Sequence, residues 1–123
     1  MRVTAIISDL MLFSRIDAAA SAAGASLTRV DAPSALPPDR DLDLVLVDWS
    51  ARDPDWVGGL RRWCAGAPDV RVILFGRHTD LEAHAAARAA GLGPMWARSK
   101  LVVELPRLMP LAIPADSPPS VGR

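Results

Sequence analysis

One short run of the sequence restricts the fold more than any other. The segment 42–47 is aliphatic except for Asp43, and after Asp43 it does not alternate between apolar and polar residues. A strand with one exposed face alternates, whereas a strand covered on both faces does not. The segment is therefore predicted to be a central strand of a parallel sheet, and the rest of the chain must supply helices for both faces.

The remaining sequence supplies such elements in alternation. Further strands are predicted at 3–7, 25–30, 70–75 and 95–97, and helices at 12–23, 56–65, 80–90 and 100–111. Short strands that alternate with longer helical segments produce a parallel sheet with crossover helices. The predicted fold class is α/β, with a doubly wound, five-stranded parallel sheet in a three-layer sandwich.

Start and stop signals refine these helices. Gly24 follows the first helix and suits a left-handed cap. Thr79 and Glu82 have the spacing of a capping box ahead of the helix 80–90. Pro106 is expected to kink, shorten or begin the last helix. Three prolines between residues 31 and 41 leave room for about one helical turn, so the second helix is predicted to be short or missing.

Composition bounds the type of protein. The length of 123 residues, of which 50% are hydrophobic and 23% charged, fits one globular domain, predicted at 2–112, followed by a flexible tail at 113–123. Fourteen basic residues balance fourteen acidic ones, so no net charge attracts nucleic acid directly. No apolar run approaches the roughly 20 residues of a membrane span, and Asp9 interrupts the apolar N-terminus. A cytoplasmic protein is expected.

Functional residues are sought where the strands end. In open α/β sheets, ligands bind beyond the carboxyl ends of the strands. The side chains predicted at or near these ends are Ser8, Asp9, Asp48, Gly76, Arg98 and Lys100.

Four segments in this order, IISDLMLF, LVLVDWS, VILFGRH and MWARSKL, resemble the receiver domain of bacterial response regulators, a flavodoxin-like fold. The resemblance covers about residues 2–112. It implies an acidic pair after the first strand, a phospho-accepting aspartate after the third, a serine or threonine after the fourth and a lysine after the fifth. Those places are taken here by Ser8 with Asp9, by Asp48, by Gly76 and by Arg98.

These positions depart from the family pattern. Ser8 replaces one acid, so that only Asp9 and Asp48 remain as ligands for Mg²⁺, and weak binding of the metal is expected. Gly76 lacks the hydroxyl group. Arg98 keeps the positive charge but not the shape of lysine, and Lys100 is the alternative cation for the pocket. The changes favour a degenerate pocket, a pseudo-receiver.

A purely structural interpretation stands beside this one. Asp48 then only follows a buried strand, and Asp9 is an acidic residue at a helix N-terminus, where the macrodipole favours it. Arg98 would form an ion pair with Asp48 or Asp9.

Three functions follow. The first is a non-enzymatic signalling module of the two-component or phosphorelay type, acting through contacts with a sensor kinase or a downstream effector. The second is a stand-alone receiver phosphorylated on Asp48. The third is a small ligand-binding flavodoxin-like domain, which is the weakest, since no glycine-rich phosphate loop follows the first strand.

A protein contact is expected on the face formed by the helix 80–90, the fifth strand and the final helix. In the family these elements correspond to the fourth helix, the fifth strand and the fifth helix. A homodimer through this face is one possible outcome. Receivers commonly use this face. His84 and Arg88 are four residues apart and lie on one helical face, and Met95 and Trp96 belong to the fifth strand. The alternative is that the alanines of the helix only pack on the sheet.

Overall fold

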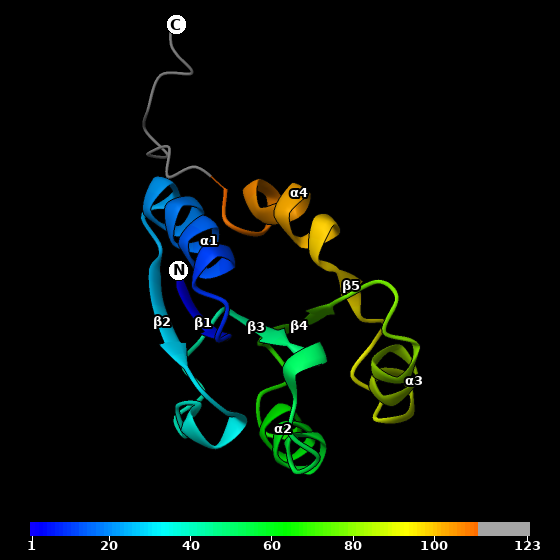
Figure 1. The fold of residues 1–123 in the computed structure, drawn as a ribbon. Helices are drawn as coiled ribbons and strands as arrows, with labels where there is room; N and C mark the ends of the chain where they lie inside the picture. Colours follow the sequence, from blue (N-terminus) through cyan, green and yellow to red (C-terminus); the bar gives the residue numbers. More distant parts are fainter. Residues whose placement is uncertain (111–123) are drawn as a thin grey trace, which may run out of the picture.

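The structure is a computed structural model that describes residues 1–110, and it forms one parallel sheet between two helical layers (Figure 1). The strands are β1 (Arg2–Ile6), β2 (Ser26–Val30), β3 (Leu44–Asp48), β4 (Arg71–Gly76) and β5 (Trp96–Ala97), in the order β2-β1-β3-β4-β5. The α-helices are α1 (Leu10–Ala23), α2 (Trp56–Ala65), α3 (Leu81–Ala89) and α4 (Arg98–Leu108), and two 3₁₀ turns are η1 (Pro33–Ala35) and η2 (Trp49–Ala51). This is the flavodoxin-like strand order, and the predicted fold class is confirmed.

Strand β3 is the centre of the sheet, as its sequence predicts. All five of its residues are buried, and it pairs in parallel with β1 on one side and β4 on the other. Val45 lies between Thr4 and Val72 in this register. Because both faces of β3 are covered, its side chains are apolar, with Asp48 at its carboxyl end as the exception.

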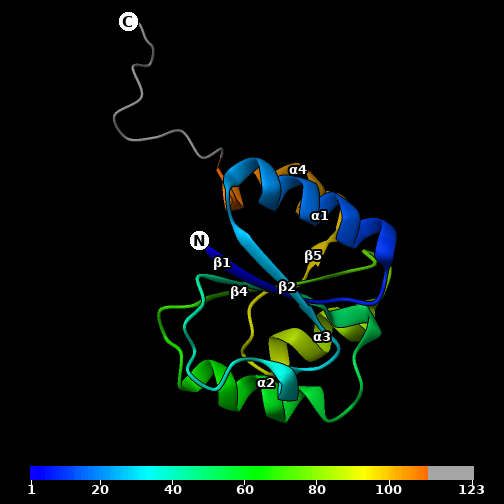
Figure 2. The same cartoon turned by 90° about the vertical axis from the view of Figure 1, so that its left-hand side faces the viewer.

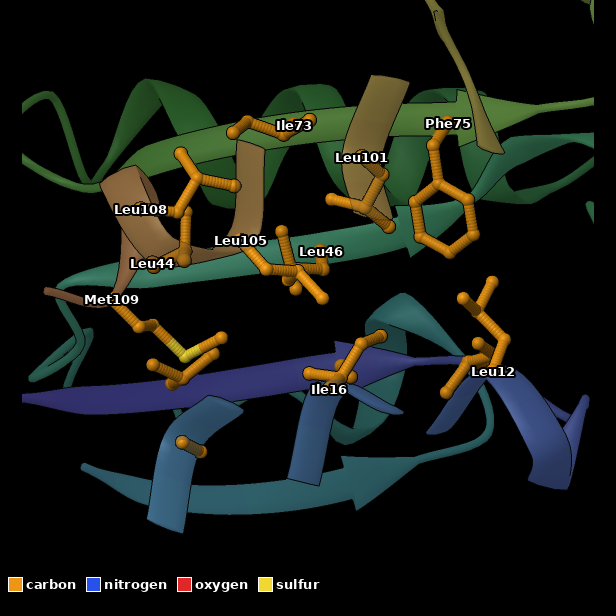
Figure 3. Close-up of a cluster of buried hydrophobic side chains, with 14 residues drawn as sticks. Leu12, Ile16, Leu44, Leu46, Ile73, Phe75, Leu101, Leu105, Leu108 and Met109 are labelled. Atoms are coloured by element: carbon orange, nitrogen blue, oxygen red, sulfur yellow. The ribbon is translucent and has the colours of Figure 1, made fainter. Parts of the chain in front are cut away.

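Helices cover the sheet in pairs, with α1 and α4 on one face and α2 and α3 on the other (Figures 1 and 2). On the first face, Leu105 of α4 and Leu46 of β3 meet in the middle of an apolar cluster (Figure 3). On the second face, Trp56, Leu60 and Trp63 of α2 pack with Val45 and Val47. The two clusters form the core on the two faces of the sheet. The polar side chains considered below lie at the carboxyl edge of the sheet.

Helix α1 ends with the glycine cap that its sequence predicts and begins with an aspartate cap. Gly24 has a φ of 67° and closes the helix in the left-handed conformation. At the start, Asp9 accepts hydrogen bonds from the N–H groups of Met11 and Leu12 at 3.1 and 3.2 Å. Asp9 thus has a structural task before any chemistry is considered.

The predicted capping box of Thr79 and Glu82 is wrong for helix α3. The capping residue is Asp80, which accepts from the Ala83 N–H at 3.1 Å, and not Thr79. The helix therefore begins one residue later than predicted, and Glu82 falls outside the box spacing. The hydrogen bond from Ala83 lowers the pKa of Asp80, and the Ser50 hydroxyl lowers it further.

Helix α4 begins at Arg98 rather than at residue 100, so Arg98 is its first residue. Pro106 lies inside the helix, which ends two residues later at Leu108, short of the predicted 111. Pro106 therefore does not begin the helix and is accommodated inside it. The helix ends where Met109 leaves the helical conformation, because Pro110 disfavours a helical conformation for the residue before it.

The segment between β2 and β3 replaces a full helix by the single turn η1. Trp63 of α2 donates its Nε1–H to the Pro37 carbonyl at 2.9 Å. Arg40, at a φ of 56°, reaches the Trp63 carbonyl with its Nε at 3.4 Å. The prediction of a short or missing helix is confirmed, and these two contacts fix the segment to the end of α2.

The predicted domain boundary and the predicted tail are not tested by the structure. The domain boundary at 112 and the tail at 113–123 lie outside the described residues. Within residues 1–110, no helix combines the length and the apolarity needed to cross a membrane.

Candidate functional site

Three side chains that are distant in sequence meet at the carboxyl edge of the sheet. Asp9 stands at the N-terminus of α1, Asp48 is the last residue of β3, and Arg98 is the first residue of α4. The crossover connections of a parallel sheet bring these three positions to one edge.

Arg98 bridges the two carboxylates. Its Nη1 donates to Asp9 Oδ2 at 3.3 Å, and its Nη2 donates to Asp48 Oδ2 at 3.2 Å. The Asp48 side chain is only 2% exposed, whereas those of Asp9 and Arg98 are about one third exposed, at 36% and 38%. The expected ion pair of Arg98 with Asp48 or Asp9 is therefore present with both partners.

Few carboxylate oxygens remain free. Asp9 uses Oδ1 to cap α1 and Oδ2 to bind Arg98. Asp48 uses Oδ2 for Arg98, while its buried Oδ1 has no hydrogen-bond partner within residues 1–110. Burial raises the pKa of Asp48. The charge and hydrogen bond of Arg98, and the nearby N–H of Ala51, act in the opposite direction but only partly offset the burial, and the charge of Asp9 adds to the increase.

The residues do not fit the magnesium ion that the resemblance implies. A cation shared by Asp9 and Asp48 would have to displace a guanidinium that is bonded to both and does not lose its charge in proteins. Ser8 is exposed and neutral. Across the part of the chain that the structure describes, no three acidic, histidine or cysteine side chains are grouped to hold a metal ion.

Lys100 does not reach the acidic pair in this structure. Its Nζ lies 4.5 Å from the centre of the Trp96 ring, and Arg71 approaches the same ring at 6.0 Å. Of the two cations that the sequence offers, Arg98 is the one at the pocket. Lys100 instead covers a half-buried tryptophan beside β5.

The predicted interaction face needs one correction. Met95 is 4% exposed and belongs to the apolar cluster beneath α2 and α3, so it is not available to a partner. Trp96 is half-buried, and Arg88 is exposed. The His84 Nε2 lies 3.2 Å from the carbonyl oxygen of His78, which orients its ring.

Gly76 stands next to a hydroxyl group that sequence reasoning missed. A Cβ at Gly76 would overlap Ser50 Oγ and lie 2.9 Å from Ser50 Cβ. Ser50 Oγ accepts from the Arg77 N–H at 3.0 Å. Trp49, between Asp48 and Ser50, was also missed as a contact of α3. Neither residue carries a sequence signal, because the contact depends on how η2 lies against the end of β4.

Comparisons with known proteins place the fold. No family model and no curated protein sequence matches the chain. Among solved structures, a response regulator receiver domain protein from Clostridium thermocellum is 15% identical with a TM-score of 0.62, covering 88% of this chain and 93% of its own. The isolated receiver (REC) domain of RcsB from Salmonella enterica serovar Typhimurium is also 15% identical, with a TM-score of 0.64 and coverages of 87% and 83%.

A response regulator from Thermotoga maritima is 17% identical, with a TM-score of 0.64 and coverages of 88% of this chain and 96% of its own. Identities this low do not carry functional residues across, but the similarity extends over most of both chains and therefore shows a shared fold. The chain therefore has the fold of the response-regulator receiver domains that its sequence resembles.

Proposed function

We propose that this chain is a receiver-like signalling module of the two-component or phosphorelay type, with a degenerate phosphorylation pocket, that acts through protein contacts in the cytoplasm. The observation that carries the proposal is the bridge from Arg98 to Asp9 and Asp48. It places an internal cation where the reactive pocket of a receiver would bind a metal ion and a phosphoryl group.

Two features of the site oppose phosphorylation. Asp48 is buried and one of its oxygens is bonded to Arg98, so its carboxylate is poorly accessible to a phosphodonor. Phosphoryl transfer is catalysed mainly by positioning and by cations that neutralise the developing charge. Within residues 1–110, the cation that contacts both aspartates is a planar guanidinium, whose fork already matches two carboxylates and is not equivalent to a compact ammonium group.

In this proposal, output depends on which partner binds and not on phosphate. A pocket closed by its own ion pair holds one conformation, so the signal comes from association with a sensor kinase or an effector protein. Leu81 on α3 and Val103 on α4 are 77% and 71% exposed, and they offer apolar contacts on the two helices nearest β5.

One observation favours the second function, a stand-alone receiver phosphorylated on Asp48. Asp48 Oδ1 has no partner within the described residues, so one acceptor oxygen is not used by the bridge. A phosphodonor that displaces Arg98 would find this oxygen available.

Incubation with a small phosphodonor and Mg²⁺, followed by intact-mass measurement, separates the two functions. We expect no stable phosphoryl adduct on the wild-type chain, since the transfer must break the Arg98 bridge. Asp48→Asn assigns any adduct, and Asp53→Asn is the matched control, because Asp53 is exposed and outside the bridge. An adduct on the wild type and on Asp53→Asn that Asp48→Asn abolishes would establish the second function instead.

A further inference from the structure

The residues that follow Asp48 are bonded to α3. From these contacts we infer that Trp49 and Ser50 are positioning residues that tie the β4–α3 segment and α3 to the end of β3, so that the place of α3 depends on the loop that carries Asp48. The inference goes beyond the proposed function, because it holds whether or not Asp48 accepts a phosphoryl group.

Trp49 makes the first tie. Its side chain is fully buried, and its indole Nε1–H donates to the Ala83 carbonyl at 3.0 Å. Ala83 lies in the first turn of α3, 34 residues further along the chain. A buried indole N–H without a partner is costly, so the bond fixes where α3 can start relative to η2.

Ser50 makes the second tie, and Gly76 makes room for it. Ser50 Oγ accepts from the Arg77 N–H at 3.0 Å, directly after β4. A Cβ at position 76 would overlap this oxygen and would also lie 3.0 Å from Met95 Sδ. Gly76 and Ser50 therefore fit each other, and only one of the two positions can carry a side chain in this arrangement.

Arg52 covers the ties from solvent. Its guanidinium lies 5.2 Å from the centre of the Trp49 ring, and its Nη1 donates to the Trp49 carbonyl at 3.1 Å. Its ion pair with Glu82 of α3, at 3.4 Å, involves a carboxylate that is 91% exposed. Because solvent screens such a pair strongly, we assign the positioning to Trp49 and Ser50 and not to Arg52.

The ties matter because α3 has little else to hold it. The fully buried side chains within the helix are those of two alanines, Ala83 and Ala87. A methyl group buries far less apolar area than the leucines that anchor α4, namely Leu101, Leu105 and Leu108. The Trp49 bond to α3 and the Ser50 bond to the segment just before it therefore supplement a small apolar contact.

Hydrogen–deuterium exchange on the full chain tests the inference. Trp49→Phe keeps a ring and removes the Nε1–H. Trp63→Phe is the matched control, since Trp63 is also buried and its Nε1–H also binds a carbonyl, that of Pro37. We expect Trp49→Phe to speed exchange in residues 77–90 by roughly five-fold relative to the wild type, and Trp63→Phe to speed exchange in 31–43 while leaving 77–90 unchanged.

Two smaller changes keep the test valid if Trp49→Phe does not fold. Ser50→Ala should speed exchange of the Arg77 amide, and Gly76→Ser should do the same by displacing Ser50. Exchange in 77–90 that rises no more in Trp49→Phe than in Trp63→Phe, or no faster Arg77 exchange in Ser50→Ala, would overturn the inference.

Discussion

Asp9 and Asp48 carry the same functional group in different environments. Asp9 caps α1 and is partly open to water, so water and the helix amides solvate its charge. Asp48 has one oxygen on Arg98 and the other buried without a partner in the described chain. A shared cation therefore does not make the two carboxylates equivalent, because desolvation acts on Asp48 far more than on Asp9.

We predict that the stability of Asp48→Asn, relative to that of the wild type, increases with pH. Burial raises the folded-state pKa of Asp48 above the ordinary value of 3.8. The folded state then binds the proton more tightly than the unfolded state, so this group lowers the stability of the wild type as pH rises from below 3.8 through the raised pKa. Asparagine does not titrate and escapes this loss.

Urea unfolding of both proteins across the acid range and up to pH 7 measures the difference. The free energy of unfolding of Asp48→Asn, relative to that of the wild type, should increase with pH by about 1.4 kcal/mol for each pH unit by which the pKa is raised. The increase should end above the folded-state pKa. A difference that stays constant with pH, or decreases as pH rises, would show that Asp48 does not have a raised pKa.

At the scale of elements, substitutions of Gly59 and Gly76 distinguish the effect of backbone freedom from the effect of packing. Gly59 lies inside α2, and a Cβ there would meet only Pro33 Cβ at an ordinary 3.8 Å. Gly59→Ala should therefore raise the free energy of unfolding by about 0.5–1 kcal/mol, because alanine loses less conformational freedom in a helix. Urea unfolding tests this directly.

Gly76→Ala is the matched comparison at the end of β4. The same added methyl group would overlap Ser50 there, and we expect a loss of about 1–3 kcal/mol, as for overpacking in a core. If both changes have the same sign, the fit between Gly76 and Ser50 is not the reason for glycine at that position.

The elements that could be predicted from sequence are those whose signal is burial. An aliphatic segment covered on both faces has one solution, and β3 follows it. Helix starts were less predictable: Thr79 and Asp80 are both good capping residues, and only the backbone decides that Asp80 caps α3. Helix α4 begins two residues before the predicted start, because Ala97 provides no capping side chain that would mark Arg98 as the first helical residue.

At the scale of the molecule, topology made the site partly predictable. The order of strands places Asp9, Asp48 and Arg98 at one edge whatever their neighbours are. The reach of side chains was not predictable: Lys100 could turn to the pocket or to Trp96, and the packing of the Trp96 ring decides it. The contact of Ser50 with Gly76 depends on the path of η2, which a single sequence does not encode in a local pattern.

The last prediction is that two copies associate through the face formed by α3, β5 and α4. Arg88 is exposed on α3, and His84 is held one turn earlier on the helix by the His78 carbonyl. The double change of His84→Glu with Arg88→Glu alters the charge of this face by three units without touching the buried Ala83 and Ala87. Light scattering should give a dimer for the wild type and a monomer for this variant, which should remain folded.

The matched control changes the charge equally on α2, through Arg61→Glu with Ala65→Glu, two exposed positions also four residues apart. Like charges introduced at a polar rim oppose association only if that rim is in the interface, so the control should remain dimeric. A wild type that is monomeric at high concentration excludes the dimer. A control that dissociates as the α3 variant does would mean that net charge, and not the α3 face, governs association.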